Sequence, residues 1–356
     1  MTQTTCSLDA IAALPPDFAQ PDVLALLERE YGLRGSLAVL VSERDQNFRL
    51  ETADGSRFVV KIANSAEPFE ITDFQVRALQ HLESRGCDVA VPRVISTENG
   101  AAITTIGEGA GLHHLRVVSY VPGVPLEGQR PGRDVAFDMG RSLALIDRAL
   151  QDFAHPGESQ VLLWDMQRAA ELRALVGHVP GELRGLVHEC IDHFESRLAP
   201  TFAELRKQVI HNDLNPGNIL VSEGNSLAVA GVIDFGDMLR APLVVDVAIA
   251  ASYLRDTDDE FAALAAFVAG FESQLLLEER ERELLFDLIR TRLAATITIL
   301  YWRAAARSPD DPYLGKALEE RSAERFLRHL SQLGREPFLE SVFLEKIFEI
   351  SGLDER

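Results

Sequence analysis

Residues 209–221 read Val-Ile-His-Asn-Asp-Leu-Asn-Pro-Gly-Asn-Ile-Leu-Val, which sets the pattern His-x-Asp-x-x-x-x-Asn between two apolar segments. Asp234 follows Asp213 by 21 residues, within the sequence Val-Ile-Asp-Phe-Gly at residues 232–236. Phosphoryl transfer needs one carboxylate to accept the proton of the attacking hydroxyl. A second carboxylate and an amide oxygen must hold a divalent metal against the triphosphate. The two motifs, anchored by strands that keep such groups rigid, therefore indicate phosphoryl transfer.

An ordinary loop is the alternative for this stretch, with Asp213 as a helix cap and Asn215-Pro216-Gly217 as a turn. From background composition, the first pattern should occur by chance in roughly one or two per cent of chains this long. A second motif at a workable spacing lowers that chance by a further factor of about a hundred. The sequence thus favours a catalytic loop.

The first third of the chain has the character of a small sheet. Its apolar and polar residues alternate over short runs, as half-buried strands require. Asp54-Gly55, between two of these runs, is typical of a tight β-hairpin. The pattern predicts strands at residues 36–41, 48–52, 57–62, 101–106 and 115–121, and a helix from Pro68 to Gly86.

Beyond Pro122-Gly123 the chain changes character, and helical periodicity dominates after a polar stretch that ends near Gly132. We expect helices at residues 134–153, 165–176, 181–198, 259–277, 279–306 and near 314–333, with the two motifs on a non-helical island between the third and the fourth. The predicted layout is α+β: a small antiparallel lobe, a hinge near residues 119–124, and a larger helical lobe.

Composition and charge exclude several classes of protein. Of 356 residues, 46% are hydrophobic and 25% are charged, as in an ordinary globular chain. Three cysteines without a Cys-x-x-Cys spacing argue against a disulfide framework. A net charge of −20 repels nucleic acid and anionic lipid and suits cationic small molecules. Since Met1 to Leu14 lack a signal-peptide pattern and no apolar run would span a bilayer, we expect a cytoplasmic protein.

The two motifs resemble those of the aminoglycoside phosphotransferase/choline kinase family, which shares the protein-kinase-like fold. The family's catalytic loop corresponds to residues 211–218, and its metal-binding motif to residues 234–237. Within the family, the chain is most similar to the hydroxylysine kinase group. That likeness runs from about residue 36 to the mid-300s in family order, and it takes in residues 58–64, 120–125, 234–238 and 246–250.

This resemblance implies a two-lobed fold with a small antiparallel N-lobe that carries one helix and a larger, mainly helical C-lobe. Residues 1–35 would form a helical N-terminal extension, and residues 36–121 the nucleotide-binding N-lobe. Residues 122–356 would form the C-lobe with the catalytic loop, the metal site and the acceptor pocket.

The resemblance also implies roles for individual residues of the two motifs. Asp213 would act as the base, in a catalytic loop that also contains His211. Asn218 and Asp234 would be ligands of Mg²⁺. The phosphoryl donor would be ATP or GTP.

Lys61 ends the third predicted strand, where a lysine of this fold contacts the inner phosphates of the nucleotide. A solvent-facing edge lysine is the alternative. Related kinases place a glutamate one turn before the leucine that matches Leu79, but this chain has Gln75 there. Glu70 and Asp73 lie nearby, and each is either the acidic partner of Lys61 or a solvated surface acid.

Residues 42–47 join the first two strands and would cover the phosphates, although they lack the glycines of a protein-kinase loop. Three of their side chains are candidate donors to phosphate, namely Ser42, Gln46 and Asn47. A plain hairpin loop is the equal alternative. From the fold resemblance alone, the hinge would offer backbone groups to the purine from Ser119, Tyr120 and Val121.

Several charged residues are candidates for the acceptor side of the site. Asp237, at the end of the metal motif, would hold a substrate ammonium or make a local structural hydrogen bond. Asp246 is expected to support the catalytic loop through hydrogen bonds. Arg290 and Arg292 face different directions on a long helix, and Arg292 is the candidate for a substrate carboxylate. Surface ion pairing with the preceding Glu281 and Glu283 is the default expectation for both arginines.

The leading hypothesis is a small-molecule kinase that uses Mg²⁺ and moves the γ-phosphoryl group of ATP or GTP onto an alcohol. The acceptor candidates are, in order, 5-hydroxylysine or a similar hydroxylated amino acid, homoserine, an amino alcohol and an aminoglycoside. A catalytically silent, kinase-like binding protein is the second hypothesis, and the intact motifs argue against it. A protein kinase is the third, disfavoured because the chain lacks a glycine-rich loop and an Ala-Pro-Glu element after Asp234.

Overall fold

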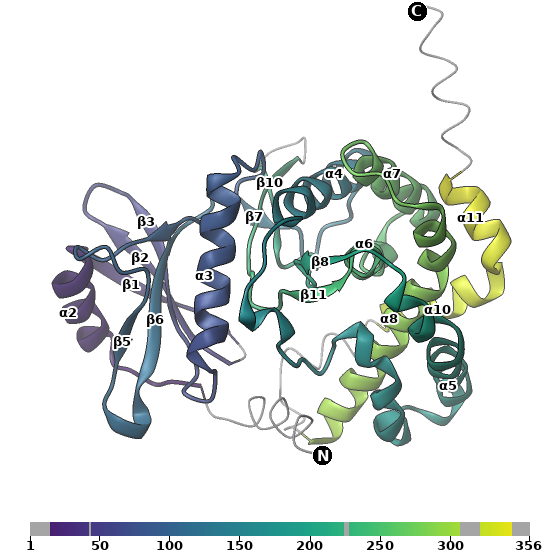
Figure 1. Ribbon diagram of the computed structural model, residues 1–356, viewed down its shortest axis with the longest axis horizontal. Helices are drawn as coiled ribbons and strands as arrows, with labels where there is room; N and C mark the ends of the chain where they lie inside the picture. Colours follow the sequence, from purple (N-terminus) through teal and green to yellow (C-terminus); the bar gives the residue numbers. More distant parts are fainter. Residues whose placement is uncertain (1–14, 43, 224–227, 307–320, 344–356) are drawn as a thin grey trace, which may run out of the picture.

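The computed structural model describes residues 15–42, 44–223, 228–306 and 321–343, and it has two lobes (Figure 1). The first lobe is built on a six-stranded antiparallel sheet in the order β1-β2-β3-β6-β4, with β5 paired to β6. The strands are β1 (Gly35–Leu40), β2 (Gln46–Thr52), β3 (Arg57–Ile62), β4 (Val94–Ile95), β5 (Thr104–Ile106) and β6 (His113–Ser119).

The hairpin between β2 and β3 turns at Asp54-Gly55, as predicted. Gly55 has a φ of 82°, which glycine adopts without steric cost. The Asp54 carboxylate accepts a hydrogen bond of 3.1 Å from the Ser56 N–H and closes the turn. The resulting register places Lys61 opposite Asn47, near the end of β3.

Helix α2 (Gln20–Tyr31) covers the face of this sheet that points away from the second lobe (Figure 1). It ends at Gly32, whose left-handed φ of 63° allows its N–H to donate a hydrogen bond to a backbone carbonyl in the last turn of the helix. The helix and the strands share a small apolar core, to which α2 contributes Val23, Leu26, Leu27 and Tyr31. An extension that precedes the sheet is therefore part of the first lobe's core.

Helix α3 (Phe69–Ser84) connects the two lobes and lies between the sheet and the second lobe in Figure 1. Its side chains Phe74, Ala78 and Leu82 are fully buried in the large core of the second lobe, which also includes Val118 of β6. Burial of this apolar face stabilises one arrangement of the lobes.

The chain passes to the second lobe between the end of β6 and β7 (Val124–Pro125), which already pairs with β9. This lobe contains a three-stranded sheet in the order β10-β9-β7 and a two-stranded sheet of β11 and β8. The remaining strands are β8 (Lys207–Ile210), β9 (Ile219–Val221), β10 (Val229–Val232) and β11 (Leu239–Pro242).

The rest of the second lobe is helical. Its α-helices are α4 (Arg133–Leu150), α5 (Gly181–His193), α6 (Leu243–Ala251), α7 (Glu260–Glu272), α8 (Glu279–Ala306), α10 (Ser322–Leu333) and α11 (Arg335–Phe343). A π-helical turn, Phe194–Leu198, extends α5. The 3₁₀ helices are Pro156–Ser159, Met166–His178, Ala199–Ala203 and Leu254–Asp256, with Gly109–Gly111 in the first lobe.

Two expected helices differ from the structure. The segment predicted at 165–176 is a 3₁₀ helix, and the beginning of the helix predicted near 314–333 lies outside the described residues. Helix α6 was not expected, because all of its residues are buried and its unbroken apolar run shows no helical period. Within the described ranges, no helix combines the length and apolar character that crossing a bilayer requires.

Candidate active site

The catalytic loop, residues 211–218, connects β8 to β9 and is held from behind by α6. The Asp246 carboxylate accepts a backbone N–H on each oxygen, from His211 on Oδ2 and from Asn212 on Oδ1, both at 2.8 Å. Asn212 has a left-handed φ of 64°, which asparagine tolerates better than most residues. These two bonds are the support that the sequence predicts for Asp246.

The His211 ring positions this loop and does not face the site. It is fully buried, and it packs edge-on against Phe235 with 4.8 Å between ring centroids. Its Nδ1 accepts the N–H of Asp213 at 3.3 Å, and its Nε2 lies 3.3 Å from the Ile233 carbonyl oxygen. Burial lowers the pKa of His211 to about 4, so the ring stays neutral. The grouping of His211 with the catalytic residues is therefore corrected to a positioning role.

Asp213 presents its carboxylate at the centre of the loop. Its Oδ2 accepts hydrogen bonds of 2.9 Å from the side-chain amides of Asn215 and Asn218. Burial raises the pKa of Asp213 to about 8, Asp237 adds to this effect, and the positive charge of Arg292 opposes it. A divalent cation bound nearby would lower this pKa again, because it favours the charged carboxylate.

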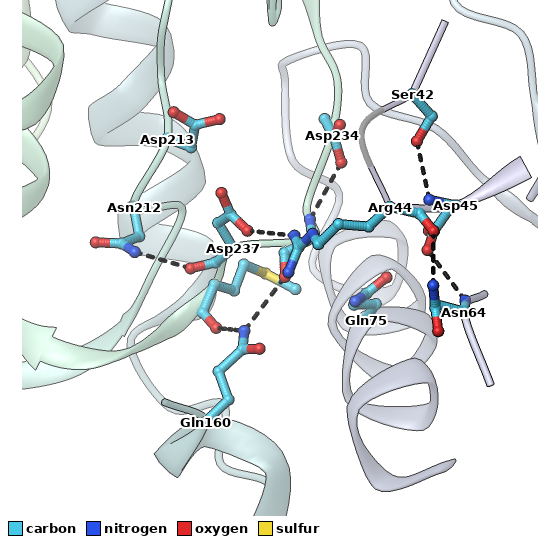
Figure 2. A network of polar contacts seen from close by, with 12 residues as sticks. Ser42, Arg44, Asp45, Asn64, Gln75, Gln160, Asn212, Asp213, Asp234 and Asp237 are labelled. Atoms are coloured by element: carbon cyan, nitrogen blue, oxygen red, sulfur yellow. Dashed lines mark hydrogen bonds and ion pairs between the residues drawn. The ribbon is translucent and has the colours of Figure 1, made fainter. Parts of the chain in front are cut away.

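Asp234 lies across the site from Asp213 (Figure 2), and it is the more exposed of the two acids. It has a left-handed φ of 61°, and its side chain is 51% exposed. The Lys61 ammonium lies 3.2 Å from Asp234 Oδ1 and lowers the pKa of Asp234 to about 2. Asp234 is thus ionised at neutral pH, and Lys61 of the first lobe reaches the metal motif of the second.

The donor set at this point fits a divalent metal held jointly with phosphate. The Asn218 amide nitrogen donates to Asp213, which leaves its oxygen as the atom that can bind a metal beside the ionised Asp234. No group of three or more His, Cys, Asp or Glu side chains suited to a metal occurs in the described part of the chain. Two protein oxygens suit Mg²⁺, which keeps several waters and binds phosphate oxygens.

The expected acidic helix partners of Lys61 are engaged elsewhere or lie on the surface. The Asp73 carboxylate contacts Arg77 Nε at 3.2 Å and His155 Nε2 at 3.1 Å. Glu70 is exposed at the start of α3, and Lys61 pairs with Asp234 in its place. The expectation that Glu70 or Asp73 pairs with Lys61 is therefore corrected.

Gln75, which occupies the position of the glutamate in related kinases, has a different partner. It accepts a hydrogen bond from the buried guanidinium of Arg116, the residue opposite Lys61 on β6. A neutral glutamine suits an arginine whose positive charge also helps to lower the pKa of Asp234. Arg116 thus adds a second buried positive charge beside Lys61.

The connection between β1 and β2 uses its polar side chains mainly within the protein. The Gln46 amide exchanges hydrogen bonds with the backbone N–H and C=O of Phe18, so its expected contact with phosphate is corrected to an anchor for the segment before α2. Ser42 Oγ accepts the Asp45 N–H at 3.3 Å. Asn47 Oδ1 is buried without a hydrogen-bond partner among the described residues.

The hinge residues are also bound within the lobe. The Ser119 N–H donates to the Arg93 carbonyl at 2.8 Å, and the Tyr120 N–H donates to the Arg57 carbonyl at 3.2 Å. Neither N–H is then available to the purine edge, so the expectation is corrected for these two N–H groups alone. Val121 is buried at the same crossing and remains the predicted backbone contact.

Asp237, at the end of the metal motif, has an arginine partner from the other lobe. Arg44 Nη2 lies 3.0 Å from Asp237 Oδ1, and the Asp237 side chain is only 13% exposed. Gln160 donates its side-chain amide to the carbonyls of Gly236 and Met238 and fixes the backbone around Asp237. The Asp237 backbone carbonyl accepts the Asn212 side-chain amide at 2.9 Å, which ties it to the catalytic loop (Figure 2).

Arg292 is close enough to Asp237 for its positive charge to lower the pKa of that acid, and it is not a surface residue. It is 5% exposed, and it donates to the Trp164 carbonyl at 3.1 Å and to the Tyr253 hydroxyl at 3.4 Å. Its Nε has no hydrogen-bond partner among the described residues. Arg290 forms an ion pair of 2.7 Å with Glu189, although its own side chain is only 11% exposed.

Sequence reasoning missed three residues around the site: Arg44, Trp164 and Asp147. Arg44 lies in the connection already singled out as covering the phosphates, so its charge was the available signal. Trp164 and Asp147 stand far from both motifs along the chain. No local pattern indicated their place.

Asp147 on α4 forms a buried carboxyl pair with Asp246. Both side chains are fully buried and hydrogen-bonded to each other. Neither oxygen of Asp147 has a donor among the described residues, so Asp147 must itself donate a proton to Asp246. Burial raises the pKa of Asp147, and burial raises the pKa of Asp246 to about 6.

As pH rises, Asp147→Asn should therefore lose less stability than wild type does. A carboxyl whose pKa is raised by folding releases its proton more readily when unfolded, so stability falls from about pH 4 upward, through 6 and beyond. An asparagine amide can donate to Asp246 without titrating. We expect the variant to gain melting temperature relative to wild type between pH 5 and pH 8.

Thermal unfolding across this pH range checks the prediction. Asp147→Ala is the control, because it removes the donor and should melt lower at every pH by at least about 2 °C. Parallel pH curves for wild type and Asp147→Asn would show that the carboxyl pair does not carry the shared proton.

The two-lobed fold and the acidic site between its lobes define a phosphotransferase of the protein-kinase-like class that acts on hydroxyl groups. Residues 37–285 match the phosphotransferase enzyme family (APH), and the chain belongs to this family. The chain is a small-molecule kinase. The predicted α+β fold, the family resemblance and the enzyme class are thereby confirmed.

Curated relatives cover almost the whole chain. It is 26% identical to the hydroxylysine kinase of Mus musculus in an alignment of 358 positions that covers 94% of each protein. It is 27% identical to the hydroxylysine kinase of Xenopus laevis in an alignment of 364 positions that covers 94% of this chain and 96% of that protein.

Solved structures agree in fold at low sequence identity. An amicoumacin kinase, in complex with AMP-PNP, Ca²⁺ and Ami, superposes with a TM-score of 0.66 at 15% identity and covers 89% of this chain and 98% of its own. A microcompartment-associated aminopropanol kinase gives a TM-score of 0.61 at 19% identity, with 86% and 98% covered.

Proposed function

We propose that this kinase transfers the γ-phosphoryl group of ATP or GTP to the hydroxyl of a small amine-bearing acceptor, with 5-hydroxylysine as the first candidate. Full-length relatives named hydroxylysine kinase support this substrate. The single observation that carries the proposal is that Asp213 lies within reach of one negative and one positive side chain, Asp237 and Arg292, whose charges both act on its carboxyl group.

In the proposed step, the acceptor oxygen forms a bond to the γ-phosphorus and the bond from that phosphorus to the bridging oxygen breaks. The hydroxyl proton passes to the Asp213 carboxylate, and the electron pair leaves with the nucleoside diphosphate. Lys61 contacts the inner phosphates, while Asn218 and Asp234 supply oxygens for Mg²⁺. The metal neutralises charge on the phosphates when it is bound.

The acceptor would be recognised by its charges. Asp237 is proposed to hold the ammonium group, and Arg292 the carboxylate of an amino acid, which an arginine fork can bind in a bidentate way. Homoserine, an amino alcohol or an aminoglycoside remain alternative acceptors. Residues 36–121 would bind nucleotide, residues 122–356 the acceptor, and residues 1–35 would be the N-terminal extension of a cytoplasmic enzyme.

A panel of hydroxylated amino acids, amino alcohols, aminoglycosides and uncharged alcohols tests this proposal through phosphate transfer. We expect 5-hydroxylysine to have the highest kcat/KM. Asp237→Asn should raise KM for the amine acceptor more than it lowers kcat, as when mainly uniform binding is lost. The surface variant Asp258→Asn, at an 88% exposed carboxylate, is the matched control. Preference for homoserine or an uncharged alcohol over every diamine acceptor would overturn the substrate assignment.

A further inference from the structure

Arg44 belongs to the first lobe, but its side chain ends in the second (Figure 2). Its backbone is fixed, because Asn64 donates its side-chain amide to the Arg44 carbonyl at 3.2 Å and its N–H to Asp45 Oδ1 at 3.3 Å. These bonds hold Arg44 and Asp45 beside Asn64, which follows the end of β3. The loop that covers the phosphates therefore presents a guanidinium at a fixed point above the site.

The Arg44 guanidinium lies among the acidic groups of the site. Besides its 3.0 Å contact with Asp237 Oδ1, it stands 5.5 Å over the ring of Trp164 and feels the charge of Asp234. The side chain is 29% exposed, so it can move without unpacking a core. Arg44 thus stands between the carboxylate proposed for the acceptor and the carboxylate proposed for the metal.

The proposed acceptor and Arg44 compete for one carboxylate. If Asp237 binds the acceptor's ammonium, that cation must displace or share the guanidinium at Oδ1. A displaced guanidinium still has a fixed backbone and a short reach, so it stays in the cleft beside Asp234. The strongest anion there is the triphosphate, and an arginine fork matches phosphate oxygens in a bidentate way.

We propose that Arg44 exchanges Asp237 for the transferring phosphoryl group when the acceptor's ammonium binds, so that acceptor binding itself completes the charge stabilisation of phosphoryl transfer. This inference rests on the proposed function. It assigns Arg44 as a catalytic residue in the connection between β1 and β2. Before the acceptor arrives, Asp237 holds the arginine away from the nucleotide and limits transfer of phosphate to water.

Trp164 reports the movement of Arg44 without any turnover. The chain has two tryptophans, so Trp302→Phe leaves Trp164 as the only one. With a non-hydrolysable nucleotide and Mg²⁺ present, addition of 5-hydroxylysine should change Trp164 emission, because the guanidinium leaves its ring. The same titration in Trp302→Phe/Arg44→Gln should lack the part of the emission change that comes from the guanidinium leaving the Trp164 ring. An identical change in both proteins would overturn the exchange.

Transfer kinetics test the catalytic part. Arg44→Gln should lower kcat for phosphate transfer on the order of 10²-fold, as when one donor to transition-state charge is lost, with little change in the nucleotide KM. The kcat of Arg44→Lys should lie between those of wild type and Arg44→Gln, because lysine keeps the positive charge but lacks the two-pronged guanidinium. Arg34→Gln, at a 78% exposed arginine of the same lobe, is the control and should match wild type.

Nucleotide hydrolysis without acceptor tests the restraint by Asp237. Asp237→Asn should raise this background rate severalfold, and the double variant Asp237→Asn/Arg44→Gln should lose the increase. Wild-type kcat in Arg44→Gln, or a background rate independent of Arg44, would overturn the inference while phosphate transfer by wild type still upheld the proposed function. Absence of transfer by wild type to every amine-bearing acceptor would overturn both.

Discussion

Asp213→Asn should bind nucleotide like wild type and lose most of its turnover. Asp213 lies inside the catalytic loop with its carboxylate oriented by two asparagine amides, the arrangement expected of a base that must accept a proton at one place. A positioned general base contributes on the order of 10²–10⁴ in rate. An asparagine keeps the size and can still accept the hydrogen bonds from Asn215 and Asn218, so the loop should stay folded.

Steady-state kinetics with the best acceptor, together with titration of a fluorescent nucleotide, separate the two effects. Asp192→Asn, at a 63% exposed acid paired with Arg173, is a control for the removal of one negative charge. A variant that kept more than about a tenth of wild-type kcat would show that Asp213 is not the base.

Asp234→Asn should weaken metal and nucleotide binding together, and by more than Asn218→Ala does. Asp234 would supply charge as well as an oxygen to the metal, and Lys61 lowers the pKa of Asp234 so that it stays ionised. Loss of an outer-shell partner already costs about 10–100-fold in metal affinity, so loss of a charged ligand should cost at least as much. Asn218→Ala removes a neutral oxygen and also two hydrogen bonds to Asp213, one to its backbone carbonyl and one to its carboxylate.

Titration of Mg²⁺ at fixed nucleotide, read out by fluorescent-nucleotide binding, checks this order without turnover. Asn215→Ala provides the comparison, because it also removes a hydrogen bond to Asp213 but no proposed metal ligand. Unchanged metal dependence in both Asp234→Asn and Asn218→Ala would remove these residues from the metal site.

The parts of the fold that could be predicted are those with a local pattern. The strands of the first lobe alternate and turn at Asp54-Gly55, so their register follows from neighbours in the sequence. Helix α6 could not be predicted in this way, because a helix buried on all sides has no polar face. The 3₁₀ geometry of Met166–His178 likewise depends on packing that no local pattern records.

In the candidate site, too, the residues that could be predicted are those with a local sequence pattern. Asp213, Asn218 and Asp234 come from contiguous motifs whose spacing already indicates their chemistry. The partners of charged residues come from tertiary contacts, such as the ion pair of Arg44 with Asp237 across 193 residues. Spacing on α3 suggested Asp73 for Lys61, but the lobe arrangement gives Asp73 to His155. The charged residues can be identified from the sequence, but their ion-pair partners depend on the tertiary structure.

Helix α2 has a consequence for dividing this protein into parts. The family match begins at residue 37, yet four of the eleven buried residues in the small core beneath the first lobe's sheet come from the helix that precedes it. A chain trimmed to residues 37–285 would leave Phe48, Leu50 and Val60 facing water. Exposed strand faces of this kind promote aggregation. The boundary of family similarity is therefore not a boundary of folding, and a fragment of this enzyme that keeps the first lobe folded has to begin before Gln20.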